Sequence, residues 1–243
     1  MGALEPAWYA AGPGKLRDWL SLLHPPYTAW HLSYVLIGAS LAPRFHLGRL
    51  LATLAAFALA VGVGAHGLDE LKGRPLRTAI PAPLLAAVSL VSISAAVALG
   101  VIGIYRVGWG LAAFILVGLV LVVGYNLEIW HGRLHGGVVF ALGWGSFPLL
   151  TAYYAQASSL RASAVLGAVF AYFFSRAQRA LSTEARDLRR RVVSVAGERV
   201  YETGTRVELT RDALLRPLEQ ALVALSWCTC VLGAALVVAR TGY

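Results

Sequence analysis

The chain has 243 residues, of which 58% are hydrophobic and only 14% are charged, and its formal net charge is +9. Soluble domains carry roughly 25% charged residues, so this composition excludes an ordinary soluble domain and indicates an integral membrane protein. Several apolar segments approach the ~20 residues that a membrane-spanning helix needs. The sequence therefore predicts an all-α membrane protein with about seven transmembrane helices. The seven segments are 27–43, 47–68, 82–105, 109–127, 137–156, 160–180 and 218–239.

The first 26 residues contain no long apolar run of the kind found in cleavable signal peptides. Residues 15–24 alternate charged residues with Leu and Trp at helical spacing, which is typical of a short helix lying in the membrane interface. Pro25 and Pro26 would end that helix. We expect a cytoplasmic N-terminal segment over residues 1–26 and a single transmembrane domain over residues 27–243.

Basic residues are distributed unevenly between the two sets of loops. If the first apolar segment crosses outward, sixteen Lys and Arg residues lie on the inner side and five on the outer side. This imbalance predicts a cell-membrane protein whose N-terminus is cytoplasmic and whose C-terminus is outside. It explains the basic excess without a nucleic-acid partner. It also provides electrostatic attraction for an anionic lipid or a phosphorylated substrate.

Ionisable residues crowd the end of the second apolar segment, where His66, Asp69, Glu70, Arg74 and Arg77 follow one another closely. Ionisable groups at the mouth of a membrane helix are costly to bury, and they usually bind or move something polar. The alternative is a juxtamembrane loop whose charges are simply hydrated. The density of acidic, basic and imidazole groups favours a binding site.

Two further polar groups follow the fourth and sixth apolar segments, so topology places them on the same side of the membrane. Tyr125, Asn126 and Arg133 form the first, and Glu184 and Asp187 precede three arginines in the second. Carboxylates from two loops can hold Mg²⁺, which shares its remaining coordination sites with phosphate oxygens. Arginines pair with the same oxygens. Together these residues predict a site for a diphosphate ester whose hydrocarbon tail lies in the bilayer.

The segment 181–217 is the least membrane-like part of the chain. Its first part continues the sixth apolar segment as a solvated basic helix. Alternating apolar and charged residues, broken by Gly197 and Gly204, then predict a small β-hairpin. Thr210 is a candidate N-cap for the next helix. Two roles stay open for this cytoplasmic insert, a cap over the inner mouth of the bundle or a passive ordered loop.

The remaining histidines and cysteines carry weaker signals. His131 and His135 are four residues apart and could ligate a metal on a helix, although neighbouring glycines argue against a rigid helix there. Hydrogen bonding to lipid headgroups is the alternative. Cys228 and Cys230 lie two residues apart in the last apolar segment, on different faces of a helix, and we interpret them as small apolar fillers.

The order of these groups resembles the UbiA superfamily of intramembrane aromatic prenyltransferases. That family places Asp-rich motifs after its second and sixth helices, and a Tyr-plus-basic loop before a Gly-rich helix after its fourth. The resemblance extends over about residues 15–235. The matching segments and residues are 26–39, Asp69 with Arg74 and Pro75, Tyr125 and Asn126 through Arg133 to 136–148, and Glu184 with Asp187.

The chain departs from the family pattern at both acidic motifs. The first motif has an Asn and two Asp residues at four-residue intervals, and this chain has Ala65 and Gly73 on either side of Asp69. Glu184 and Asp187 stand three residues apart where the family has two Asp residues four apart. The family usually has nine helices, and the final pair is absent from the seven expected here.

The resemblance implies an isoprenyl diphosphate as the substrate, membrane lipid as the surroundings, and a lipophilic or aromatic acceptor. It implies Mg²⁺ as the cofactor, with Asp69 and Asp187 as catalytic residues. The implied Mg²⁺ ligands are Asp69, Glu70, Glu184 and Asp187, and the implied substrate-binding residues are His66, Arg74, Arg77, Tyr125, Asn126 and Arg133.

Two other functions stay open from the sequence. The missing Asp residues favour a non-catalytic descendant of the UbiA fold that binds an isoprenoid or quinone-like lipid, or that acts as a membrane partner. His66, His131 and His135 could instead belong to a metal-dependent membrane hydrolase or a haem-binding protein.

Overall fold

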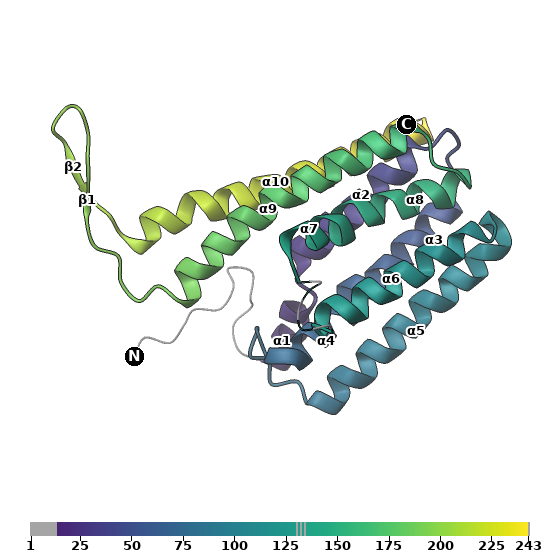
Figure 1. Ribbon diagram of the computed structural model, residues 1–243, viewed down its shortest axis with the longest axis horizontal. Coiled ribbons are helices and arrows are strands. Elements are labelled where there is room, and N and C mark those ends of the chain that lie inside the picture. Colours follow the sequence, from purple (N-terminus) through teal and green to yellow (C-terminus); the bar gives the residue numbers. More distant parts are fainter. Residues whose placement is uncertain (1–13, 130, 132, 134, 243) are drawn as a thin grey trace.

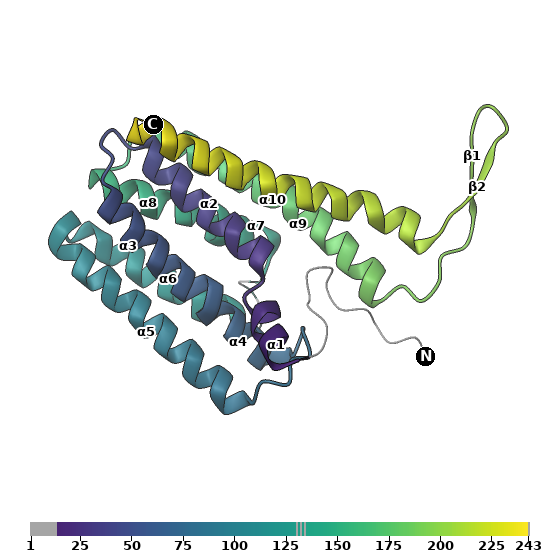
Figure 2. The same cartoon turned by 180° about the vertical axis from the view of Figure 1, so that it is seen from behind.

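The computed structural model describes residues 14–129, 131, 133 and 135–242. Long helices lie side by side in a bundle, and one pair of helices extends beyond it to carry a small two-stranded hairpin (Figures 1 and 2). The all-α fold predicted from the sequence is therefore confirmed.

The long helices cover the apolar segments of the sequence, and two of them contain a stretch of wide π-helical turns. α3, η1 and α4 form one continuous helix, and α7, η2 and α8 form another. The elements are α1 (Lys15–Leu22), α2 (Pro25–Leu41), α3 (Leu47–Phe57), η1 (Ala58–Ala65), α4 (His66–Gly73), α5 (Ala82–Val107), α6 (Gly110–Asn126), α7 (Gly137–Phe140), η2 (Ala141–Ser146), α8 (Phe147–Ala157), α9 (Ala162–Arg190), β1 (Glu198–Val200), β2 (Arg206–Glu208) and α10 (Arg211–Thr241).

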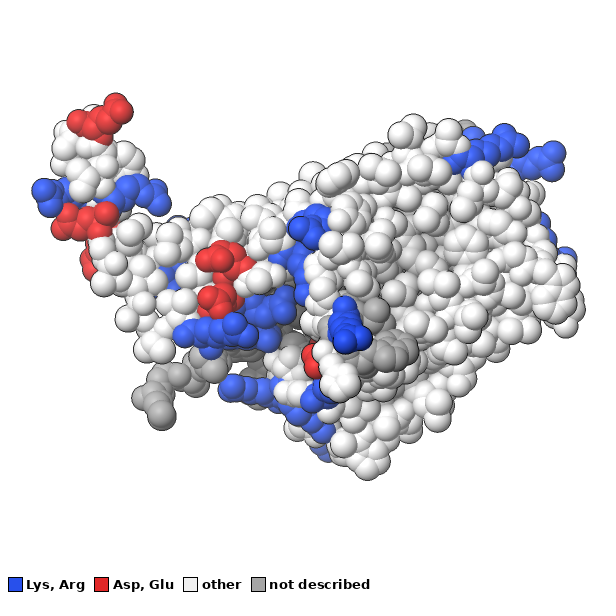
Figure 3. Space-filling view, viewed as in Figure 1, with Lys and Arg blue, Asp and Glu red and all other residues white. Residues whose placement is uncertain are grey.

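Four helices among the described residues are long and apolar enough to cross a membrane: Leu47–Gly73, Ala82–Val107, Gly137–Ala157 and Arg211–Thr241. The outer surface of α5 exposes large apolar side chains, as a surface that faces lipid does. Charged residues gather at the ends of the bundle and leave a broad uncharged belt between them on the face in Figure 3. The membrane prediction is consistent with these features, with four spans by this criterion where the sequence predicts about seven.

Helix α2 lies at the centre of the packing. Its Trp30 and Tyr34 are almost fully buried and contact Leu149 of α8 and Ala171 of α9. Gly38 allows α2 and α8 to approach closely, because a Cβ atom at that position would collide with the backbone carbonyl of Leu149. The bundle is therefore organised around a helix that begins at one end, beside α1, and ends at the other.

The three local predictions outside the apolar segments, a short helix before the prolines, a β-hairpin and an N-cap at Thr210, are confirmed. Helix α1 ends at Leu22, shortly before the prolines, and β1 pairs with β2 in an antiparallel hairpin. Thr210 caps α10, because its side-chain oxygen accepts a hydrogen bond of 3.1 Å from the backbone N–H of Ala213. The hairpin lies at the far tip of the α9–α10 extension, away from the bundle helices (Figures 1 and 2).

Candidate functional site

A cavity of about 210 Å³ opens at the end of the bundle where α4, α6 and α9 meet. Its walls come from the start of α2, the η1–α4 junction, the end of α6, the π-helical turns of η2, and parts of α9 and α10. Lys and Arg side chains surround a hollow at this end of the molecule (Figure 3). We call this space the basic cavity.

One face of α9 supplies four arginines to the basic cavity, and we call Arg179, Arg186, Arg189 and Arg190 the arginine wall. Their spacing keeps them on one side of the helix. Arg189 is engaged by Glu219 of α10, with Nη2 donating to Oε2 at 2.9 Å. Arg186 has no hydrogen bond or ion pair with any described residue, so its guanidinium is available to an anionic ligand.

Arg179 connects the arginine wall to the end of α6. Its Nη1 donates to the Tyr125 hydroxyl at 2.9 Å, and its Nη2 donates to the backbone carbonyl of His135 at 3.2 Å. The guanidinium also lies over the Phe140 ring, 4.7 Å from its centroid. These contacts hold one edge of the guanidinium, and they place Tyr125, which the sequence selects as a substrate-binding residue, on the cavity wall.

The neighbouring carboxylates Asp69 and Glu70 have different environments. Asp69 is half-buried, lines the basic cavity, and makes no hydrogen bond or ion pair with the described residues. Glu70 is fully buried and accepts hydrogen bonds from the backbone N–H groups of Leu76 and Thr78 at 3.0 and 2.9 Å. The Thr78 hydroxyl donates to it as well, at 2.9 Å. Glu70 therefore organises the loop after α4, and Asp69 is the carboxylate left for a ligand.

The two basic residues predicted to bind substrate in this loop lie outside the lining of the basic cavity. Arg74 donates to the carbonyls of Thr78 and Ile80, at 3.3 and 2.7 Å, and so holds the loop from inside. Arg77 is exposed and has a left-handed backbone conformation, with φ of 56°. His66, by contrast, lines the cavity one turn before Asp69.

The second acidic motif is not brought together with Asp69. Glu184 is exposed, and Asp187 forms an ion pair of 3.5 Å with Arg191 on the solvent side of α9. Neither acid belongs to the described lining of the basic cavity, because the arginine wall occupies that face of the helix. Asn126 reaches the cavity, whereas Arg133 lies in an exposed turn after α6.

The oxygen donors in the cavity fit one divalent ion better than the paired acidic clusters that the resemblance implies. Asp69 supplies a carboxylate, and the buried Gln178 Oε1 has no hydrogen-bond partner. Mg²⁺ commonly takes one or two carboxylates and fills its remaining sites with phosphate and water oxygens. A single ion carried by a diphosphate could therefore bind at Asp69. No group of three His, Cys, Asp or Glu side chains converges for a metal within the described part of the chain.

Histidines form the side of the basic cavity nearest α2 and α4. His24 and His66 stack with ring centroids 4.2 Å apart. Burial, and then the charges of His66, Arg190 and Arg186, lower the pKa of His24 well below its usual value. His135 stacks on Tyr125, and His131 is exposed in the turn that precedes it. The proposed set of His66, His131 and His135 thus gains no support as a metal or haem site.

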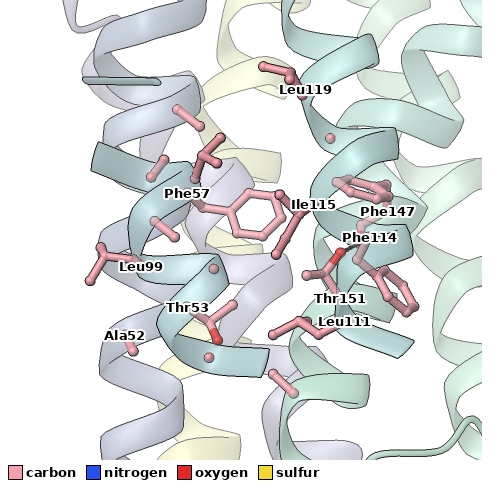
Figure 4. Close-up of a pocket in the computed structure, with 18 of the residues that line it drawn as sticks. Ala52, Thr53, Phe57, Leu99, Leu111, Phe114, Ile115, Leu119, Phe147 and Thr151 are labelled. Atoms are coloured by element: carbon pink, nitrogen blue, oxygen red, sulfur yellow. Dashed lines mark hydrogen bonds between the residues drawn. The ribbon is translucent and has the colours of Figure 1, made fainter. Parts of the chain in front are cut away.

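A second, larger cavity of about 550 Å³ lies between α3, α5, α6 and α8, and we call it the apolar cavity. Figure 4 shows Phe57 of α3 and Ile115 of α6 pointing toward one another across this space, with Phe114 and Phe147 beside them. Its few polar side chains include His46, Arg49 and Arg106, toward the end of the bundle opposite the basic cavity.

The two cavities are adjacent inside the bundle. Val61 in η1 and Trp144 in η2 line both of them. Each of these residues lies in a π-helical segment, a widened helical turn that is frequent at functional sites. An apolar space and a basic space therefore lie next to each other, with these two residues between them.

No family model, curated protein or solved structure matches the chain.

Sequence reasoning missed several residues of the basic cavity. Arg179 and Arg186 are seven residues apart in α9, and this spacing places both on one helix face. The sequence alone was therefore sufficient to group these two residues. His24 and His31 gave no signal, because only the fold brings them to His66. Gln178 is likewise recognisable only once the cavity is known.

Proposed function

We propose that this chain is a UbiA-like membrane protein that binds an isoprenyl diphosphate and transfers its prenyl group to a lipophilic or aromatic acceptor. The observation that carries the proposal is that an apolar cavity and a basic one lie next to each other, with Val61 and Trp144 lining both. An isoprenyl diphosphate has the same division, with a long hydrocarbon chain attached to a compact anion. The arginine wall would hold the diphosphate while the prenyl chain fills the apolar cavity.

The chemistry follows from where charge develops during transfer. As the bond between the prenyl C1 carbon and the diphosphate oxygen breaks, negative charge accumulates on the leaving group. Arg186 and Arg190 are cationic groups at the cavity wall that would stabilise this charge. The allylic cation left behind is captured by the acceptor inside the apolar surroundings, which exclude water. A Mg²⁺ ion bound with the diphosphate at Asp69 would add further positive charge.

We infer a membrane orientation from the same charges. The basic cavity would face the cytoplasm, where sixteen of the basic residues are expected. Besides the four helices that meet the spanning criterion, α2, α6 and α9 would complete seven crossings. The start of α2 and the end of α10 lie at opposite ends of the bundle, as an odd number of crossings requires (Figure 1).

A non-catalytic isoprenoid-binding protein of the same fold is the second candidate. It is favoured by one observation, namely that Glu184 and Asp187 do not line the cavity in which Asp69 lies. A site with a single unengaged carboxylate can retain a phosphorylated isoprenoid without ionising it.

The test uses the purified full chain in nanodiscs, with radiolabelled prenyl diphosphates, with and without Mg²⁺, and with a membrane-lipid extract as the acceptor source. Binding and diphosphate release are measured separately. Binding with release supports the transferase, and tight binding without release supports the second candidate. Absence of binding for every chain length would refute both.

A matched pair of variants connects the result to the arginine wall. Arg186→Gln should weaken diphosphate binding by about 10- to 100-fold, because a charged hydrogen bond to phosphate is lost. Arg191→Gln lies five residues further on, pairs with Asp187 outside the cavity, and should bind like the wild type. An equal loss of diphosphate affinity in both variants would indicate that binding depends on overall positive charge and not on the arginine wall.

A further inference from the structure

His31 and His66 are held in the same tautomeric form. His31 Nδ1 lies 2.8 Å from the carbonyl oxygen of Trp144, and His66 Nδ1 lies 3.2 Å from that of Gly62. A carbonyl oxygen can only accept, so each Nδ1 carries a hydrogen and donates it. In the neutral ring, Nε2 is then a hydrogen-bond acceptor with a free lone pair.

Both of these acceptor atoms belong to rings that line the basic cavity, and neither Nε2 has a hydrogen-bond partner among the described residues. The arginine wall nearby supplies only donors. Of the two acidic residues in the described lining of the cavity, Glu219 engages Arg189 and only Asp69 is left. The cavity therefore combines a cationic region on α9 with two neutral acceptors on α2 and α4. A diphosphate would bind to the cationic region, and its oxygens, which are acceptors, would not pair with the two neutral acceptors.

We propose that His31 and His66 line a subsite for a hydroxyl group of the acceptor substrate, that this hydroxyl donates its hydrogen bond to His66 Nε2, and that His66 is the general base that removes the proton. This inference rests on the proposed transferase function and specifies its acceptor as a phenol or alcohol. A quinone offers only carbonyl acceptors, so it is a poor partner for these two nitrogens.

The step balances as an ether-forming transfer. The C1–oxygen bond of the prenyl diphosphate breaks, and its electron pair leaves with the diphosphate on the arginine wall. The acceptor oxygen forms the new bond to C1 with its own electron pair, and its proton passes to His66 Nε2. The resulting imidazolium lies in the same cavity as the departing diphosphate, an arrangement that stabilises both charges.

His24 is a positioning residue in this scheme. Its ring stacks on His66 with centroids 4.2 Å apart, and the His66 ring is thereby held by a neighbouring ring and by the Gly62 carbonyl. A ring held at two points presents Nε2 in one direction, which proton transfer requires.

The first test measures hydroxyl recognition without any diphosphate. A lipophilic 4-alkylphenol and its methyl ether are titrated calorimetrically into the full chain in detergent. The hydrogen bond from the phenol hydroxyl to His66 Nε2, which the ether cannot make, should make the phenol bind about tenfold more tightly than the ether. His66→Phe keeps an aromatic ring for His24 to stack on and should reduce this ratio to about one. His131→Phe, in the exposed turn, is the matched control and should keep the ratio.

The second test separates hydrogen bonding from proton removal. The side-chain oxygen of His66→Gln can accept a hydrogen bond but cannot act as a base near neutral pH. This variant should retain much of the preference for the phenol, and its kcat for ether formation should fall at least about 100-fold with the KM for the prenyl diphosphate unchanged. Equal wild-type binding of phenol and ether, or full transfer by His66→Gln, would overturn the proposal.

The outcomes distinguish this inference from the function on which it rests. A hydroxyl preference in a protein that binds no prenyl diphosphate would refute the transferase and leave the hydroxyl subsite standing. Diphosphate binding that is lost in Arg186→Gln, in a wild type that does not prefer the phenol, would support the diphosphate site and refute the roles of His31 and His66.

Discussion

The loop after α4 and the basic cavity contain similar residues and use them differently. In the loop, the Glu70 carboxylate accepts three hydrogen bonds and Arg74 donates to two carbonyls. In the cavity, Asp69 and Arg186 have no hydrogen bond or ion pair with any described residue. Buried polar groups are normally satisfied within the fold, so the loop is a structural unit. Asp69 is half-buried and Arg186 is exposed, so both charges are accessible to a ligand, and the cavity is the candidate site.

The largest expected effect tests the structural side of this comparison. Glu70→Ala removes a fully buried acceptor and leaves two backbone N–H groups and a hydroxyl without a partner. We expect the free energy of unfolding to fall by about 3 kcal/mol, measured by denaturant titration in detergent. Diphosphate binding per folded molecule should be unchanged, because Glu70 does not line the cavity.

Glu184→Ala is the control for this loss, since Glu184 is exposed on α9. Its effect on the free energy of unfolding should stay within ~0.5 kcal/mol. A Glu70→Ala protein of wild-type stability that no longer binds diphosphate would reverse the roles that we assign to Asp69 and Glu70.

The next effect concerns the apolar cavity. Ala56 lines this cavity, and Ala55 beside it is exposed on the outer surface of α3. Ala56→Phe fills part of the 550 Å³ and should weaken binding of geranylgeranyl diphosphate about tenfold, because several methylene groups lose their apolar contacts. Dimethylallyl diphosphate, whose chain is too short to reach that depth, should bind as before.

Ala55→Phe adds the same volume on the lipid-facing side and should leave both affinities unchanged. If both variants weaken the two ligands equally, the prenyl chain does not occupy the apolar cavity. Only the assignment of the diphosphate to the basic cavity would then remain.

A smaller effect is expected at Asp69, measured as diphosphate affinity with and without Mg²⁺. Asp69→Asn removes a carboxylate that repels the diphosphate and that can hold a cation. Without Mg²⁺, binding should become a few-fold tighter; with Mg²⁺, the metal-dependent gain should disappear and binding should be weaker than in the wild type. The unfolding free energy should change little, because Asp69 has no hydrogen-bond partner in the described structure. Identical binding by both proteins under both conditions would contradict a role for Asp69.

Local features of the fold could be predicted from the sequence, whereas features that depend on long-range packing could not. Apolar runs of about 20 residues, the Thr210 cap and the alternation near Gly197 are local signals, and each corresponds to an observed helix, cap or hairpin. The π-helical turns of η1 and η2 left no such signal.

The candidate site was predictable in its location and less so in its members. The residues His66, Asp69, Tyr125 and Asn126 were identified because they follow apolar segments that end on the same side. Which charged residue of a helix reaches the cavity depends on the face of the helix that points toward it. The sequence analysis selected Asp187, whereas the neighbouring Arg186 is the residue that lines the cavity. Arg74 lies close to Asp69 along the chain, yet its guanidinium holds loop carbonyls, a choice that only the folded backbone determines.

The smallest expected effect is a pH dependence of stability at His24. Its pKa is lowered in the folded protein by burial first and then by the charges of His66, Arg190, Arg186 and His31. The unfolded chain has the ordinary value of about 6.5 and so binds more protons than the folded chain below that pH. The free energy of unfolding should therefore be highest above pH 6.5 and should decrease as the pH falls below it.

His24→Asn isolates this contribution from that of the other histidines. The backbone of His24 is left-handed, with φ of 45°, a conformation that Asn tolerates well. Because Asn does not titrate, the variant should lose less stability than the wild type between pH 6.5 and pH 5, by a difference on the order of 1 kcal/mol. Thermal unfolding in detergent across this range measures the difference. Parallel curves for the two proteins would show that His24 takes up its proton without cost, which would contradict its placement in the cationic cavity.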